Sequence, residues 1–312
     1  MIQAMGSALT TIGLPVALGI IMFGLGLSLT PGDFARVARY PKAVIVALAC
    51  QLVLLPAIAF GLVVLFGLPP VLAVGMMLLA ASPGGTTANL YSHLFRGDVA
   101  LNITLTAINS VLAVFTLPLI TNLAIQYFLP GDDGLGLQFA KTVEVFVIVL
   151  VPVVLGMLVR WWKAGFADRM DKPVRIASVV ILAVVIVGAI VSNLELLLAN
   201  FGILAGITVL FCVLSLTVGY VAPRLLRVDR RQSVACSFEI GIHNATLAIV
   251  IAQTVVGSIE MSLPAAVYGV LMFFVALGFG FLIRGRGTAA ESAAGSAAGS
   301  SVDAPAERRP TS

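Results

Sequence analysis

The chain has 312 residues, of which 60% are hydrophobic and only 10% charged, and its formal net charge is +4. Apolar runs long enough to cross a bilayer follow one another, which predicts a polytopic membrane protein. The runs are continuous and do not alternate, so they predict helices and exclude a barrel. The basic residues lie between the runs and report membrane topology, so we exclude a nucleic-acid partner.

Nine segments are predicted to span the membrane. They cover approximately residues 9–29, 43–66, 71–94, 99–127, 140–160, 176–194, 198–222, 233–256 and 263–283. With the N-terminus outside, 17 of the 18 Lys and Arg residues fall on the cytoplasmic side, and Lys141 is the exception. Because basic residues accumulate in cytoplasmic loops, we expect an outside N-terminus, a cytoplasmic C-terminus and a location in the cell inner (plasma) membrane.

Two parts are predicted along the chain: a transmembrane domain over residues 1–286 and a cytoplasmic tail over residues 287–312. The tail consists of small and polar residues that cannot bury a core, so we expect disorder. An Ala-rich helix is the alternative, but the repeated Gly and Ser residues argue against it.

The third apolar segment contains SPGG at residues 82–85, which is expected to interrupt the helix near mid-membrane. Pro83 lacks an amide donor, and the two glycines permit non-helical dihedral angles. Thr86, Thr87 and Asn89 follow, where a new half-helix would present free N–H groups to an anion. The alternative is a simple proline kink with threonines that bond back to the helix.

The eighth segment contains EIGIHN at residues 239–244, also near its middle, with Gly241 between the polar residues. Spans one to four and six to nine form two sets of opposite orientation, and the interrupted helix is third in each. This arrangement is typical of an inverted repeat, which binds its substrate between the broken helices at the midplane.

Glu239 is the only carboxylate near a span centre, where an unpaired charge costs several kcal/mol. A carboxylate beside amides, hydroxyls and loosened carbonyls forms an oxygen-rich site that suits a hard cation such as Na⁺. Two alternatives stay open. Glu239 could be a protonated side chain bonded to a neighbouring helix, or it could carry protons with the help of His243.

Other polar residues within the spans could serve either as ligands or as contacts between helices. Gln51 lies within LACQLVLLP, and Asn102, Thr104, Thr106 and Asn109 punctuate the fourth span. Asn102 and Thr106 are four residues apart and therefore share a helix face. The three cysteines lie inside apolar runs without metal-ligand spacing.

Enzyme and channel functions are disfavoured by the same residues. The sequence has no H-E-x-x-H motif and no pair of intramembrane aspartates, so an intramembrane enzyme is not expected. A channel needs a continuous polar pore, whereas the polar residues cluster at one level.

The chain resembles the bile acid:sodium symporters and their bacterial homologues. Five features carry this resemblance in order and spacing: LGIIMFGLGLSLTPGDF at 18–34, Gln51, SPGGTTAN at 82–89, FRGDVALNITLT at 95–106 and EIGIHN at 239–244. The resemblance implies an all-α fold of two inverted five-helix repeats, with panel and core domains and two broken crossing helices. This chain looks as though it lacks the first helix, which accounts for four plus five spans.

The resemblance also implies the site residues. A first sodium site would use Asn89, Asn102, Thr106 and Glu239, with Ala88 where relatives can offer a hydroxyl. A second would use Gln51, Glu239, the carbonyls of Ile240 and Ile242, and His243. Relatives commonly have glutamine in place of His243, so the number of ions, one or two, stays open. Substrate would lie against Gly84, Gly85, Thr86, Thr87 and Asn244.

We therefore expect a secondary transporter that carries Na⁺ together with an organic anion, either bile-acid-like or a small carboxylate, by alternating access. Uptake is the expected direction, and no obligate protein partner is expected. The alternative is a proton-coupled carrier or exporter of the same fold that uses Glu239 and His243.

Overall fold

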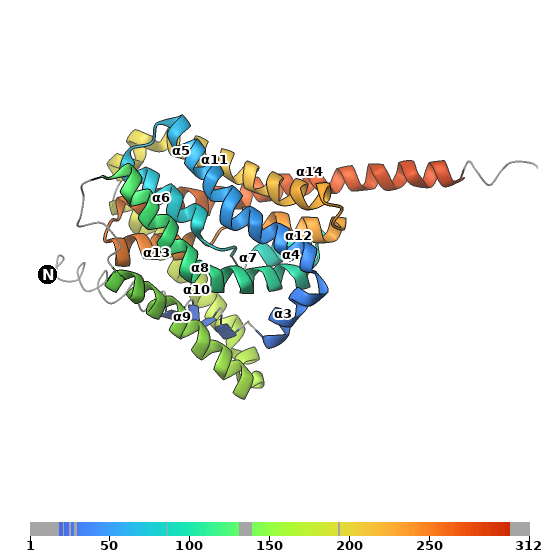
Figure 1. Cartoon of the computed structure of the whole chain (residues 1–312), viewed down its shortest axis with the longest axis horizontal. Helices are drawn as coiled ribbons and strands as arrows, with labels where there is room; N and C mark the ends of the chain where they lie inside the picture. The colour runs from blue at the N-terminus through green and yellow to red at the C-terminus, as the bar shows by residue number, and fades with distance from the viewer. Residues whose placement is uncertain are drawn as a thin grey trace, which may run out of the picture.

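A computed structural model describes residues 19–299, apart from 21, 25, 28, 29, 86, 131–138 and 193. All the regular elements in this part of the chain are helices, and residues 19–27 are helical where described (Figure 1). The first half then contains α3 (Pro31–Ala35), η2 (Arg36–Arg39), α4 (Pro41–Ala49), the π segment η3 (Cys50–Leu54), α5 (Leu55–Phe66), α6 (Pro70–Ala81), α7 (Thr87–Leu94) and α8 (Val99–Phe128). The second half contains α9 (Phe139–Trp162), α10 (Ala164–Ser192), α11 (Leu194–Leu225), α12 (Arg230–Gly241), α13 (Ala245–Ile251), the π segment η4 (Ala252–Val256), η5 (Glu260–Ser262) and α14 (Leu263–Gly299).

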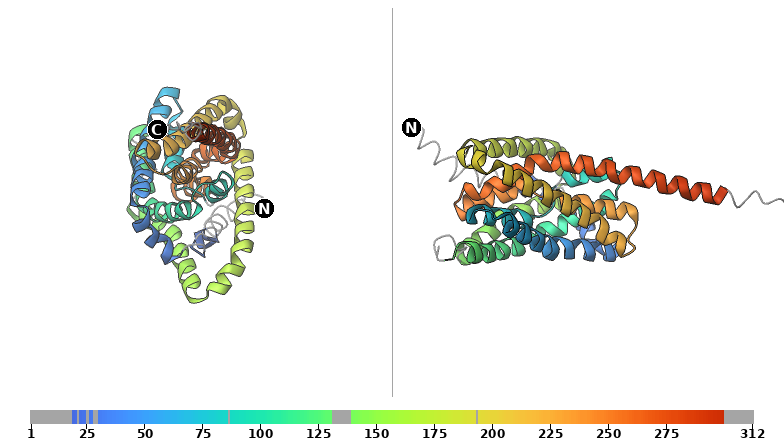
Figure 2. Two further views of the ribbon diagram at one scale, coloured as in Figure 1. Left: turned by 90° about the vertical axis from the view of Figure 1, so that its right-hand side faces the viewer. Right: turned by 90° about the horizontal axis from the view of Figure 1, so that it is seen from above.

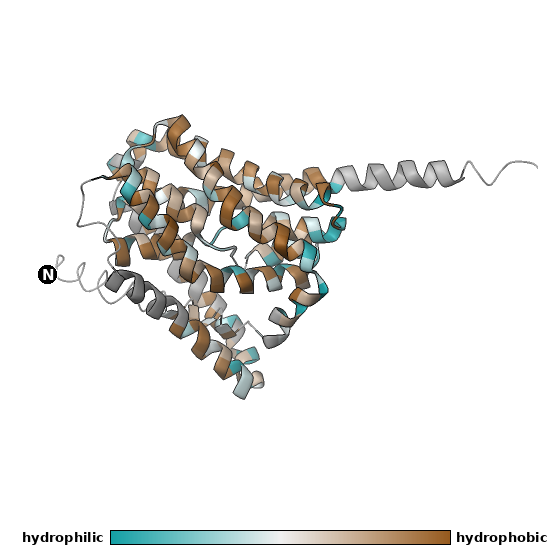
Figure 3. Cartoon of the chain, in the orientation of Figure 1, coloured by the Kyte–Doolittle hydropathy of each residue, from teal (hydrophilic) through white to brown (hydrophobic). Residues whose placement is uncertain are grey.

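The surface and the lengths of these helices suit a bilayer. Among the described residues, four helices are long and apolar enough to cross a membrane: Pro41–Phe66, Val99–Phe128, Leu198–Leu225 and Glu260–Arg284. Their outward side chains are apolar and exposed, for example Val53 at 70%, Leu65 at 77% and Leu119 at 58% (Figure 3). The prediction of an all-α membrane protein is confirmed, and the nine spans with their inverted repeat stay predictions.

Two helices are interrupted where the sequence predicts it. α6 ends at Ala81 and α7 begins at Thr87, and α12 ends at Gly241 before α13 begins at Ala245. Ser82 has extended dihedral angles, as expected for the residue before a proline. The chain therefore leaves the helical conformation in two short segments inside an otherwise helical bundle.

α12 lies at the centre of the bundle. It contacts α4, α7, α8, α11 and α14, and its residues from Ser233 to Gly241 are all buried. In the end-on view of Figure 2 the longer helices surround the short broken segments. Both interruptions therefore lie within the bundle, where Gly84 and His243 are buried and Gly85 and Asn244 are partly exposed.

A group of peripheral helices lies along one side of the bundle, made of residues 19–27, α9 and α10 (Figure 1). Gly26 and Gly156 lie at a close crossing, because a Cβ atom on either would overlap backbone atoms of the other segment. The Arg160 guanidinium donates to the Leu27 carbonyl at 2.9 Å. α9 packs on α8, and α10 contacts α13 and α14.

The C-terminal segment corrects one prediction. α14 continues as a helix to Gly299 and projects from the bundle (Figure 1), so residues 287–299 are not disordered as expected. Alanine is the best helix former, and the Ala-rich composition outweighs the scattered glycines and serines. The expectation for residues 300–312 lies outside the described residues.

The contact between α11 and α12 gives a test of the packing. A Cβ atom on Gly219 would lie 2.8 Å from Cα of Ser237, whereas one on Gly202, also on α11, would meet nothing within 4 Å. Gly219→Ala should destabilise the protein by about 1–3 kcal/mol through overpacking. Gly202→Ala should be neutral or stabilising, because Ala favours the helix by about 1 kcal/mol. Thermal unfolding of the purified protein measures both, and equal melting temperatures would contradict the packing.

Candidate functional site

The two interruptions lie against each other and pair through their backbones. Gly84 and His243 form an antiparallel bridge. The Gly85 N–H donates to the Ile242 carbonyl at 2.9 Å, and the Asn244 N–H donates to the Pro83 carbonyl at 2.8 Å. Backbone N–H and carbonyl groups that have no helical partner at one break thus form hydrogen bonds with the other break.

Side chains from three further elements hold this crossing. The Ser82 carbonyl accepts from Nε2 of Gln51 at 3.1 Å and from Nδ1 of His243 at 3.0 Å. The Gly241 carbonyl accepts from the Tyr268 hydroxyl at 2.8 Å, and the Cys212 thiol lies 3.6 Å from it. η3, α14 and α11 therefore fix the carbonyls at both helix ends.

Glu239 is fully buried two residues before the end of α12, and both of its carboxylate oxygens accept hydrogen bonds from α8. Thr106 Oγ1 donates to Oε2 at 2.6 Å, and Asn109 Nδ2 donates to Oε1 at 3.1 Å. Within the described part of the chain, no Lys or Arg forms an ion pair with Glu239. A carboxylate that is buried among neutral donors calls for a compensating positive charge or a proton.

The break beside Glu239 requires glycine at position 84. A Cβ atom there would overlap the Glu239 carboxylate and lie 2.7 Å from the backbone oxygen of Glu239. Gly84 therefore lets the first break approach the carboxylate closely, so that the two interrupted helices and α8 meet at one point.

Several buried polar atoms near this point have no hydrogen-bond partner. They are Oε1 of Gln51, Oδ1 of Asn89, Asn102 and Asn109, and Nε2 of His243. Buried polar atoms are normally paired, so a cluster of unpaired acceptors needs an explanation. All five can donate an electron pair to a cation.

The chemistry of these atoms selects the kind of cation. Amide and hydroxyl oxygens with a single carboxylate suit a hard ion of low charge. Among the described residues, no group of three or more His, Cys, Asp or Glu side chains could hold a metal ion. Because the oxygen donors include a single carboxylate, the residues fit Na⁺ better than Ca²⁺, which asks for more carboxylates.

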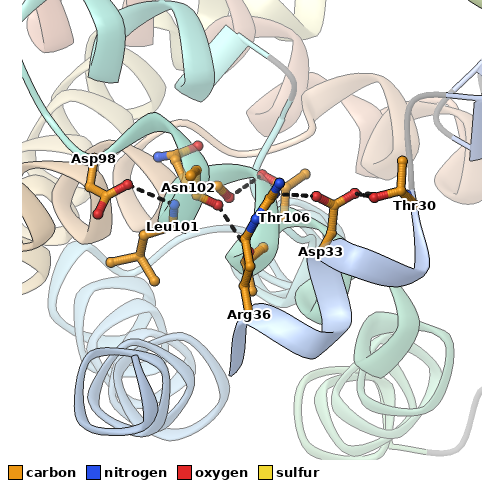
Figure 4. A network of polar contacts seen from close by, with 9 residues as sticks. Thr30, Asp33, Arg36, Asp98, Leu101, Asn102 and Thr106 are labelled. Atoms are coloured by element: carbon orange, nitrogen blue, oxygen red, sulfur yellow. Dashed lines mark hydrogen bonds and ion pairs between the residues drawn. The ribbon is translucent and has the colours of Figure 1, made fainter. Parts of the chain in front are cut away.

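Asn102 and Thr106 occupy one face of α8, as their spacing predicts. Asn102 Nδ2 donates to the Ala235 carbonyl at 2.8 Å and to Ser92 Oγ at 2.9 Å, so it joins α8 to α12 and α7. Asp98 caps α8 by accepting from the Leu101 N–H at 3.0 Å (Figure 4). α3, which contributes Asp33, packs against this helix.

The remaining predicted ligands lie at or next to the crossing. Ala88 is fully buried on α7, which packs against α8 and α12. Ile240 is buried on α12, and the Ile242 carbonyl already accepts from Gly85.

The residues expected to face substrate differ in their exposure. Gly85, Thr87 and Asn244 are partly exposed, whereas Gly84 is buried. The Asn244 side-chain oxygen caps α13 through the Leu247 N–H at 3.1 Å. Thr86 lies outside the described residues.

Sequence reasoning missed the surroundings of His243. Its ring stacks on Phe211 at a centroid distance of 5.4 Å and meets the edge of Tyr268 at 5.5 Å. Aromatic residues within apolar spans resemble ordinary packing, so no sequence signal distinguishes these two. Asn109 had a signal, because it lies seven residues after Asn102 and three after Thr106 on one helix face.

An all-α membrane bundle with two paired helix breaks around a buried polar centre is the architecture typical of membrane transport proteins. The model of the Sodium Bile acid symporter family matches residues 15–200, and the chain belongs to this family. The chain is 32% identical over 258 residues to the uncharacterized sodium-dependent transporter YocS of Bacillus subtilis (strain 168), covering 82% of this chain and 78% of that protein.

Two further relatives are matched over a smaller share of their own length or at lower identity. The probable sodium/metabolite cotransporter BASS1, chloroplastic, of Oryza sativa subsp. japonica is 32% identical over 261 residues, which cover 82% of this chain and 62% of the relative. The hepatic sodium/bile acid cotransporter of Homo sapiens is 26% identical over 277 residues, which cover 86% of this chain and 76% of that protein.

The hydroxyl of Thr106 gives a test of the polar centre. Thr106→Val removes the shortest hydrogen bond to Glu239 at nearly constant volume, so binding of ²²Na⁺ to the purified protein should weaken by about tenfold or more. Thr116→Val, on the same helix, removes a hydroxyl that donates to the Leu112 carbonyl one turn earlier and should leave binding unchanged. Equal ²²Na⁺ affinities in the two variants would argue against a cation beside Thr106.

Proposed function

We propose that this protein is a secondary active transporter that couples Na⁺ to the movement of an organic anion across the membrane. The observation that carries the proposal is a fully buried Glu239 without a basic partner among the described residues, surrounded by buried acceptors that lack hydrogen bonds. The names of the relatives, which include sodium-dependent transporters and sodium cotransporters, support the choice of ion.

The proposed first sodium site uses Glu239, Thr106, Asn102 and Asn89, with the backbone of Ala88. Unpaired oxygens on Asn89 and Asn102 support it. Burial in protein keeps water away, so each oxygen interacts with the cation in a medium of low dielectric constant, where Coulomb attraction is strong.

A second ion would use Gln51, Glu239, His243 and the carbonyls of Ile240 and Ile242. The Ser82 carbonyl can only accept, so Nδ1 of His243 carries the proton and Nε2 keeps its lone pair. Neutral His243 can therefore act as a ligand here, together with the unpaired oxygen of Gln51.

The proposed substrate is a small organic anion, either bile-acid-like or a simple carboxylate. Two sodium ions would leave one net positive charge beside Glu239, and the N-terminus of α7 adds partial positive charge. The partly exposed Gly85, Thr87 and Asn244, with Thr86, form the proposed contact surface.

Transport is proposed to follow alternating access within one transmembrane domain over residues 1–286. The peripheral helices (19–27, α9 and α10) would be the panel, and the rest the core that carries the crossing. Figure 1 draws η2, the α11–α12 turn and the projecting end of α14 at one end of the bundle. These segments carry many basic residues, which supports a cytoplasmic position for that end in the plasma membrane. Na⁺ entry would then drive uptake.

A proton-coupled carrier of the same fold is the second candidate. Two fully enclosed titratable side chains, Glu239 and His243, favour it. In that case protons would take the place of sodium, and transport would follow pH.

Thermal stability of the purified protein in NaCl and in KCl at equal ionic strength, from pH 5.5 to 8.5, tests the proposal without a known substrate. A ligand that binds only the folded state stabilises it by RT ln(1 + [L]/Kd), about 2.7 kcal/mol at one hundred times Kd. We expect sodium-specific stabilisation that Glu239→Gln abolishes. Glu260→Gln, at an exposed position in η5, is the matched control and should keep it.

Identical melting curves in NaCl and KCl, with a strong dependence on pH, would reject sodium coupling and support the proton-coupled carrier. Once sodium binding is established, added carboxylates should raise the melting temperature further in NaCl only, whereas amines should not.

A further inference from the structure

Asn109 lies on the same face of α8 as two of the proposed ligands, three residues after Thr106 and seven after Asn102. Its side chain is 1% exposed. The residue is not needed to continue the helix, because asparagine is a poor helix former in a helix interior. A buried amide at this position therefore needs a reason in its contacts.

The two ends of the Asn109 amide have different surroundings. Nδ2 donates to Oε1 of Glu239 at 3.1 Å, while Oδ1 is buried without a hydrogen-bond partner. The bond to Glu239 fixes the orientation of the planar amide, so the carbonyl oxygen is carried on a rigid group beside the carboxylate. A buried unpaired carbonyl costs free energy, which a ligand would recover.

Thr121 shows that lack of a partner is not enough to define a ligand. Its hydroxyl is also buried and unpaired on α8. It lies twelve residues further along the helix, about 18 Å from the level of Asn109 at 1.5 Å per residue. No hydrogen bond links Thr121 to Glu239 in the described structure, whereas Asn109 has one.

We propose that Asn109 is a further ligand of the sodium ion, with its carbonyl oxygen on the cation and its NH₂ group on Glu239. This inference rests on the proposed sodium site and extends it. The amide does two things at once: it orients one carboxylate oxygen and supplies a neutral oxygen of the kind that Na⁺ accepts. The α8 face of the site then comprises Asn102, Thr106 and Asn109.

The test uses the full-length protein and titrates NaCl against KCl while the melting temperature is measured. Asn109→Leu removes the oxygen at similar volume, and we expect the sodium concentration for half-maximal stabilisation to rise about tenfold or more. In KCl alone the variant should melt below the wild type, because Oε1 of Glu239 loses its hydrogen bond from Nδ2 of Asn109, so the test compares the sodium-dependent rise in melting temperature and not the value in KCl. Asn109→Ser keeps a smaller side chain whose hydroxyl can still donate to Glu239 and offer an oxygen, and it should weaken the sodium response less than Asn109→Leu does.

Thr121→Val is the matched control, since it removes a buried unpaired oxygen on α8 that lies outside the proposed site and should leave the sodium titration unchanged. A sodium titration of Asn109→Leu that equals the wild type would overturn the inference. A lower melting temperature in KCl together with the same sodium-dependent rise in melting temperature as the wild type would also overturn it, because that is the result expected of a residue that only packs. If Asn109→Leu does not fold, Asn109→Ala takes its place, and a sodium titration of that variant equal to the wild type would overturn the inference. Absence of sodium stabilisation in the wild type would instead reject the proposed function itself.

Discussion

The reciprocal backbone bonds between the two interrupted helices are the constraint on which the rest of the site depends. In a membrane, backbone groups released by a helix break must find partners inside the protein. Gly85 and Asn244 donate across the crossing to Ile242 and Pro83, so each break supplies hydrogen-bond partners for the other. This pairing brings residues from distant parts of the sequence to one place.

The crossing also determines where charge can be buried. Gly84 has no side chain and lets the first break lie against Glu239, while α8 closes the other side with Thr106. Because no basic side chain in the described chain neutralises Glu239, a mobile cation can do so. A positive charge that is free to leave is what a coupled transporter requires, whereas a fixed Arg or Lys would block exchange. Neutral amide and hydroxyl acceptors around Glu239 also suit an exchangeable cation, because they bind it without adding further buried charge.

The sequence predicted those features that depend on local backbone chemistry. Pro83 with the two glycines that follow it, and Gly241, identified the breaks, and Glu239 stood out because carboxylates are rare at span centres. The four-residue spacing of Asn102 and Thr106 correctly placed them on one face. These inferences need only helix geometry and the cost of polar groups in lipid.

Other features depend on contacts between distant segments and could not be predicted. Nothing in the sequence indicates that Gln51 and His243 share the Ser82 carbonyl, or that the rings of Phe211 and Tyr268 enclose the imidazole. The role of Asn109 was left open because helix periodicity gives the face but not the partner. The helix after residue 286 was not predicted, because the Gly and Ser residues there were interpreted as signs of a disordered tail. In the structure this segment continues α14.

An experimental structure of the protein purified in NaCl, at a resolution that distinguishes ions, tests the central claim most directly. The account predicts a sodium ion bound by Glu239 and Thr106, with the amide oxygens of Asn102 and Asn109 turned toward it. It is contradicted if the region beside Glu239 holds no ion in saturating NaCl and those amide oxygens bond to water or to other protein groups instead.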